Sequence, residues 1–181
     1  MMTAAPQPAA LTAVLALPLL TAATIPSTPD LGKAAARCRT DENGPAFLVR
    51  VEGLKDRQGK LKLEVYPAND KDFLEDDNVL LSAGKTFRRV EVPVPSSGTP
   101  QICVRVPGPG TYAVSLLHDR DGDRKFNWRV DGIGFAGNPR LGWNKPKASK
   151  ASAVVGDDPT PIEIVLNYRR GLGVAPLGNG A

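Results

Sequence analysis

Three aspartates alternate with other residues in the segment HDRDGDRKFN, residues 118–127. The carboxylates of Asp119, Asp121 and Asp123 repel one another at this spacing unless a cation lies among them. Ca²⁺ takes roughly six to eight oxygen ligands, and an alternating acidic loop supplies them from side chains and a main-chain carbonyl. The spacing therefore predicts a Ca²⁺ site in this loop.

The loop fits only the first half of the EF-hand pattern. Gly122 stands two positions earlier than the glycine of that motif, and Val130 occupies the place of its closing glutamate. Asp131, one residue further on, completes the shell if a β context bends the loop differently. The predicted metal ligands are Asp119, Asp121, Asp123, the carbonyl of Lys125, Asn127 and Asp131.

A second interpretation of the same loop needs no metal. In an acidic turn the aspartates accept hydrogen bonds from nearby backbone N–H groups. Arg120, Arg124 and Lys125 would then balance the negative charge. The sequence leaves both interpretations open.

His118 is the only histidine of the chain, which excludes a zinc site built from several imidazoles. Its position in the alternating segment places it on the apolar face of a strand. We therefore expect a hydrogen-bonded structural histidine that anchors the acidic loop. The alternative is a general base that works with the loop carboxylates, as in a hydrolase, although carboxylates on one tight loop are too crowded to flank a glycosidic bond.

The elements that position this loop are expected to be strands. Gly and Pro account for 18 and 17 of the 181 residues, and long periodic helical segments are missing. Apolar residues alternate with polar ones in six segments, which predict strands: residues 46–53, 60–67, 87–94, 101–106, 110–119 and 162–168. The turn at residues 56–60 indicates that the first two form a hairpin.

This pattern predicts an all-β protein with an immunoglobulin-like or transthyretin-like β-sandwich of six to seven antiparallel strands. The sandwich domain is expected to cover residues 46–168, with one long irregular loop between Asn127 and Pro161. Residues 169–181 show no pattern and are expected to form a disordered tail.

The N-terminal region has the features of an export signal. Residues 11–20 form an apolar run that is too short to span a bilayer, and small residues follow it. We predict a signal peptide over residues 1–23, a linker over 24–45, and a periplasmic or extracellular protein with no membrane span in its mature form. An oxidising compartment would allow Cys38 and Cys103 to form a disulfide.

Two further features bear on partners. The net charge of +4 is spread over scattered Arg and Lys residues without interleaved aromatic residues, so no nucleic-acid partner is expected. Trp128 and Trp143 bracket the segment GIGFAGN, residues 132–138. This pair either stacks on a sugar or partner protein or covers one end of the sandwich.

With HDRDGDRKFN followed by GIGFAGN, the chain resembles the bacterial domain-of-unknown-function family 2141. The resemblance covers roughly residues 46–168 and implies an exported β-sandwich. By matching position it also implies that His118, Gly134, Phe135 and Asn138 anchor the loop region. Ala136 and Gly137 depart from the Ser-Asn pair usual in the family.

Taken together, these features predict an exported, non-enzymatic β-sandwich module. Its acidic loop binds calcium and stiffens an end of the molecule that contacts an envelope protein or a glycan. Two alternatives remain from the sequence: an envelope-associated hydrolase that uses the loop carboxylates with His118, and a purely structural envelope protein.

Overall fold

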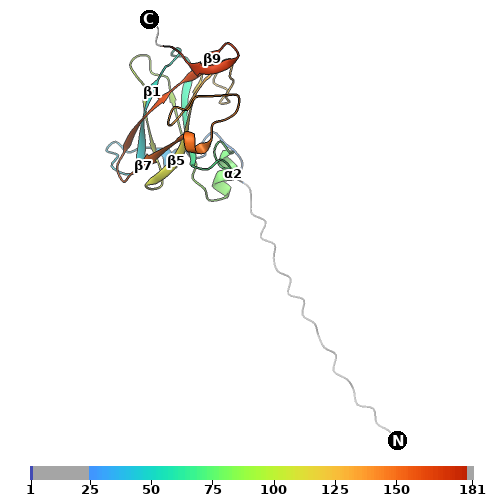
Figure 1. The fold of residues 1–181 in the computed structure, drawn as a ribbon. Coiled ribbons are helices and arrows are strands. Elements are labelled where there is room, and N and C mark those ends of the chain that lie inside the picture. The colour runs from blue at the N-terminus through green and yellow to red at the C-terminus, as the bar shows by residue number, and fades with distance from the viewer. Residues whose placement is uncertain (2–24, 179–181) are drawn as a thin grey trace.

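The computed structural model describes Met1 and residues 25–178. The predicted signal peptide, apart from Met1, lies outside the described residues. In the described part of the chain two β-sheets pack face to face, and short helical elements lie at their margins (Figure 1).

The smaller sheet has three strands, in the order β4 (Gln101–Arg105), β1 (Ala46–Glu52) and β8 (Thr160–Val165). The larger sheet has seven strands, of which six follow one another in space as β10 (Gly173–Pro176), β9 (Asn167–Arg170), β6 (Gly132–Phe135), β5 (Gly110–Asp119), β2 (Lys60–Pro67) and β3 (Arg88–Pro93). The seventh, β7 (Ser152–Val155), pairs with the first half of β5. The helices are α1 (Lys33–Ala36), α2 (Asp77–Ser82) and the single 3₁₀ turn η1 (Ala148–Lys150).

The main core lies between the two sheets. Alternate residues of each strand point inward, so that Val49 of β1, Leu63 of β2, Leu116 of β5 and Ile164 of β8 are fully buried in one cluster. Burial of these side chains drives the two sheets together. The prediction of an all-β sandwich is confirmed.

The connections differ from the prediction in three ways. β1 and β2 do not form a hairpin, because the segment between them crosses from the smaller sheet to the larger one. β1 pairs in parallel with β8, so the sandwich is not wholly antiparallel. The region predicted as one long loop contains β6, η1 and β7, which raises the number of strands in the described residues to ten.

The predicted tail also differs from what the structure shows. Residues 167–176 form the antiparallel pair of β9 and β10 at the end of the molecule opposite α2 (Figure 1). Tyr168 is buried in the main core, and this anchors the pair to the body of the protein. The folded domain therefore extends beyond residue 168.

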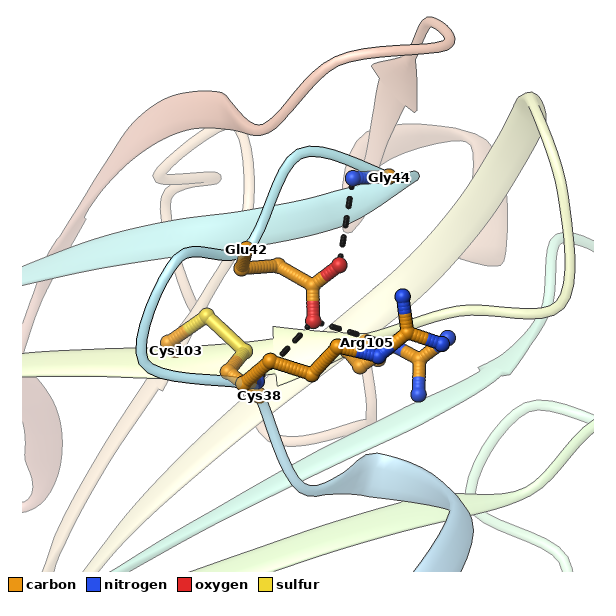
Figure 2. The surroundings of a disulfide bond; sticks show 6 residues. Cys38, Glu42, Gly44, Cys103 and Arg105 are labelled. Atoms are coloured by element: carbon orange, nitrogen blue, oxygen red, sulfur yellow. Dashed lines mark hydrogen bonds and ion pairs between the residues drawn. A yellow bond between two sulfur atoms is a disulfide. The ribbon is translucent and has the colours of Figure 1, made fainter.

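The predicted linker, residues 24–45, is folded from residue 25 onward. Ala36 of α1 is fully buried in the main core, and Cys38 forms a disulfide with Cys103 of β4. In Figure 2 the Glu42 carboxylate points back into its own turn, where it accepts hydrogen bonds from the N–H groups of Arg39 and Gly44, both at 3.1 Å. These backbone N–H groups, with the nearby Arg105 guanidinium, hold the pKa of Glu42 below its ordinary value despite desolvation. The segment therefore belongs to the sandwich.

A second apolar cluster covers part of the outer face of the larger sheet. Tyr66 of β2 and Phe135 of β6 meet Phe73 and Phe87 there, in edge-to-face ring contacts with centroids 5.5–5.8 Å apart. The segment that contains α2 lies over this cluster.

Candidate functional site

The acidic loop begins where β5 ends. Asp119 is the last residue of β5 and is only 1% exposed, whereas Asp121 and Asp123 lie in the exposed part of the loop. One carboxylate oxygen from each of the three lies within 4.8 Å of the others. The structure therefore brings together three of the six predicted ligands as an all-oxygen cluster that could hold a metal ion.

Backbone hydrogen bonds shape this cluster. Asp119 accepts the N–H of Gly122 at 2.9 Å with one oxygen and the N–H of Arg124 at 3.1 Å with the other. Asp123 accepts the N–H of Lys125 at 2.7 Å. These are the local hydrogen bonds that the metal-free interpretation predicts, and they leave further oxygen lone pairs of the carboxylates available.

The basic residues of the loop do not pair with the cluster. Arg120 donates hydrogen bonds to Asp56, through Nε at 2.9 Å and also through Nη2. Arg124 forms an ion pair with Glu91 of β3 at 2.7 Å. Among the described residues, no Lys or Arg lies within ion-pair distance of the three clustered carboxylates. The charge balance expected for a metal-free acidic turn is therefore not formed by direct pairs.

Electrostatics at the cluster point the same way. Burial raises the pKa of Asp119 above its ordinary value, and the negative charges of Asp131 and Asp121 add to this effect. The hydrogen bonds that Asp119 accepts from the backbone N–H groups of Arg124 and Gly122 offset only part of this rise in pKa. A bound cation would relieve this repulsion.

The remaining predicted ligands form hydrogen bonds within the loop. Asp131 accepts the N–H of Arg120 with one oxygen and that of Asn127 with the other, both at 2.9 Å, and so ties the two ends of the loop together. The Asn127 side chain accepts the N–H of Arg129 at 3.1 Å. Lys125 contributes its backbone N–H to Asp123. These hydrogen bonds close the loop.

His118 faces the main core, as its position in the strand predicted. Its side chain is fully buried, with Nε2 at 2.8 Å from the Gln58 carbonyl and Nδ1 at 2.6 Å from the Tyr168 hydroxyl. Burial lowers the pKa of His118 below its ordinary value, against smaller opposing effects of the Gln58 carbonyl and Asp56. His118 thus links the start of the loop to the β1–β2 connection and to β9.

The residues of the GIGFAGN segment lie in β6 and the turn after it. Gly134 faces Ile164, and Phe135 is buried in the second apolar cluster. Asn138 accepts the N–H of Val165 at 2.8 Å and donates to the Glu163 carbonyl at 3.1 Å, so it holds this turn against β8. These contacts hold the C-terminal end of β6, and none of them is made directly with the acidic loop.

An open groove of about 960 Å³ runs over the exposed outer face of the larger sheet. Its floor contains Leu117 and Ile133, and the acidic loop supplies Phe126 and Trp128 to one wall. Trp143, which is 84% exposed, stands on another wall, so it does not cover the end of the sandwich. Both tryptophans therefore line one groove.

Sequence reasoning missed several residues of this groove. Arg140 and Leu141 come from the region predicted as an irregular loop, and Arg170 and Leu172 from the predicted tail. Because these residues lie in short strands and turns without clear alternation, only their folded positions show that they share a surface.

A bacterial family model described as "Uncharacterized protein conserved in bacteria (DUF2141)" matches residues 49–163. The chain belongs to this family. No curated protein and no solved structure matches the chain at a significant level.

The DUF2141 match begins within β1 and ends within β8, so it includes the acidic loop and the two tryptophans. The β9–β10 pair, which supplies Arg170 and Leu172 to the groove, lies outside the matched residues. Among the described residues of this DUF2141 protein, no helix is long and apolar enough to cross a membrane.

Proposed function

We propose that the protein is an exported, non-enzymatic binding module. Its acidic loop binds Ca²⁺, and the bound ion stiffens the wall of the groove that contacts an envelope protein or a glycan. The observation that carries this proposal is the cluster of three carboxylates that form no ion pair with any described Lys or Arg.

The donor set fits the proposed ion. Asp119, Asp121 and Asp123 offer only carboxylate oxygens, which suit hard cations such as Ca²⁺. The flexible exposed part of a loop adapts more readily to the irregular shell of Ca²⁺ than to the strict octahedron of Mg²⁺. Further oxygen ligands would come from main-chain carbonyls or water.

The cluster and one wall of the groove belong to the same loop. Phe126 and Trp128 follow Asp123 by three and five residues, and both line the groove. A cation that fixes the carboxylates would therefore restrict the motion of this wall. Binding partners gain affinity when such a wall is ordered in advance.

The structure does not favour His118 as the base of the hydrolase alternative. Both ring nitrogens of His118 have partners inside the protein, and the ring is closed off from solvent. A general base must reach a proton of the substrate, directly or through one water molecule. His118 therefore serves the fold.

Export is supported by the disulfide. Cys38 and Cys103 are joined in the structure, and disulfides persist in oxidising compartments outside the cytosol. The apolar run near the N-terminus, which lies outside the described residues, is consistent with the same destination.

A thermal melt of residues 25–181 tests cation binding. Millimolar Ca²⁺ is compared with a chelator for the unaltered protein, for Asp121→Ala, and for Asp157→Ala as a control in an exposed turn outside the cluster. Ca²⁺ at ten times its Kd stabilises the folded state by about 1.4 kcal/mol, a shift of a few degrees for this size. The shift is expected in the unaltered and control proteins and lost in Asp121→Ala. Equal melting in Ca²⁺ and chelator would mean that the loop is only a turn and the protein purely structural at this end.

A further inference from the structure

The groove on the outer face of the larger sheet combines an aromatic lining with unpaired positive charge. Its volume of about 960 Å³ is large enough for several sugar rings or a short peptide. Trp128, Trp143 and Phe126 line it, and the exposed Asn144 side chain lies among the lining residues.

Two arginines of the groove lack anionic partners. Among the described residues, neither Arg140 nor Arg170 forms an ion pair, and both line the groove. Beside the groove, the guanidinium groups of Arg129 and Arg169 stack on the Trp128 ring, with centroid distances of 5.4 and 4.8 Å. This side of the molecule therefore presents guanidinium groups with donors to spare.

The one carboxylate that lines the groove is already neutralised. Glu64 lies beneath the groove, where Arg89 pairs with one oxygen at 2.7 Å and the Tyr66 hydroxyl donates to the other at 2.8 Å. Lys62 also lies within 3.5 Å of Glu64. Glu64 is thus committed to the protein interior, and the other charged residues that line the groove are cationic: Lys62, Arg140, Lys145 and Arg170.

We propose that this groove binds an anionic saccharide, that is, a chain of sugar rings carrying carboxylate, sulfate or phosphate groups. The inference rests on the binding role proposed for this face, but not on the bound cation. The Trp143 indole, which is 84% exposed, offers a flat apolar face for a sugar ring, while Arg140 and Arg170 pair with the anionic groups. The exposed rim and the Asn144 amide favour a polar, flat-ringed ligand over an acyl chain.

An acidic peptide is the competing macromolecule, and the structure favours it less. A peptide would most readily add a strand to a free sheet edge. The edge strand nearest the groove, β10, has only four residues and ends in Pro176, which has no N–H to donate. Long main-chain pairing is therefore not offered at this edge.

Intrinsic fluorescence tests the inference at the site itself, because the chain has two tryptophans and both line the groove. The probes are a hyaluronate tetrasaccharide, a heparin tetrasaccharide and, as the neutral match of equal length, chitotetraose. We expect at least one anionic probe to change the emission below about 1 mM, and chitotetraose to bind about tenfold more weakly or not at all. Binding should also weaken with added salt.

Variants separate the groove from general charge. The double change Arg140→Gln and Arg170→Gln is expected to weaken binding of the anionic probe about tenfold or more. Arg39→Gln, an exposed change next to Cys38 and outside the lining of the groove, should leave binding of the anionic probe unaltered. Circular dichroism confirms that each variant is folded.

The inference is overturned if neither anionic probe changes the emission at about 5 mM. It is also overturned if chitotetraose binds as well as the charged probes, or if a polyglutamate peptide or phosphatidylglycerol vesicles bind more tightly than either. Each titration is run in Ca²⁺ and in chelator. Equal saccharide affinity in both conditions would support the groove and count against its stiffening by the cation, whereas a Ca²⁺ response without saccharide binding would overturn the saccharide inference alone.

Discussion

Two hydrogen bonds determine the tautomer and the charge of the His118 ring. The Gln58 carbonyl can only accept, so Nε2 of His118 carries the proton and Nδ1 accepts from the Tyr168 hydroxyl. The Tyr168 oxygen in turn accepts the N–H of Lys55 at 3.1 Å. A second proton on the ring would remove the acceptor that the Tyr168 hydroxyl uses, so the neutral ring is favoured in the folded protein.

This arrangement predicts the titration of the only histidine. Burial lowers the pKa of His118 from the ordinary value of 6.5, so the unfolded chain binds a proton that the folded protein resists. The contribution of His118 to stability is therefore complete above pH 6.5 and is lost as the pH falls below that value. The imidazole proton resonance in NMR, unique in this chain, should shift with a midpoint below 6.5. A midpoint at or above 6.5 contradicts the described environment.

At the scale of elements, β6 depends on the absence of side chains at two positions. A Cβ at Gly134 would lie 2.6 Å from Cγ2 of Ile164 and 2.8 Å from the Val165 carbonyl oxygen. A Cβ at Gly132 would meet the ring of Tyr168. The glycines of this strand therefore permit close packing against β8 and β9.

Gly134→Ala should accordingly destabilise the protein by about 1–3 kcal/mol, the usual cost of forcing extra atoms into a packed core. Gly156→Ala is the matched control, because nothing lies within 4 Å of a Cβ there. Urea denaturation measures both. Equal midpoints for the two variants would show that β6 does not pack as described.

At the scale of elements, the sequence predicts which side chains of a strand face the core but not which strands pair. Alternation of apolar and polar residues marks which residues of β2 and β5 face the core, because side chains alternate along a strand. It does not specify the neighbouring strand. The chain crosses between the sheets through Gly53 and Gly59, both with positive φ, and the Asp119 carbonyl packs directly on Gly59. Such a close contact between distant parts of the backbone leaves no periodic pattern in the sequence. The sequence therefore predicts a hairpin where the chain in fact changes sheets.

In the candidate site, too, the sequence predicts contacts between residues close in the chain but not between distant ones. The spacing of the three aspartates predicted that their carboxylates cluster, since residues close in sequence remain close in a tight loop. The partners of Arg120 and Arg124, Asp56 and Glu91, come from other parts of the chain. Only the folded structure shows that these arginines are engaged away from the cluster, and that Trp128 and Trp143 share a groove.

At the scale of the whole molecule, a disulfide ties the N-terminal segment to the sandwich, in addition to the main chain. The Cys38–Cys103 disulfide spans 65 residues and connects the segment after α1 to β4 (Figure 2). The same segment also contacts the acidic loop, since Arg124 donates to the Pro29 carbonyl at 3.2 Å. The disulfide therefore restricts a part of the chain that supports the candidate site.

Replacing both cysteines by serine should lower the free energy of unfolding by about 2–4 kcal/mol, because the unfolded chain regains the freedom of a long loop. Urea denaturation of the oxidised protein and of the double variant measures the difference. The oxidised protein treated with a reductant should approach the variant. Identical midpoints for all three samples would show that the bond does not contribute to stability.

A cation bound in the acidic loop is expected to order the wall of the groove that Phe126 and Trp128 form. Trp143→Phe leaves Trp128 as the only tryptophan, five residues beyond the last clustered aspartate. Titration with Ca²⁺ should change the Trp128 emission with a midpoint of roughly 10⁻⁴–10⁻³ M, as for weak extracellular sites. Chelator should reverse the change, and Asp121→Ala should abolish it. This expectation is contradicted if the emission of Trp128 is the same in millimolar Ca²⁺ and in chelator.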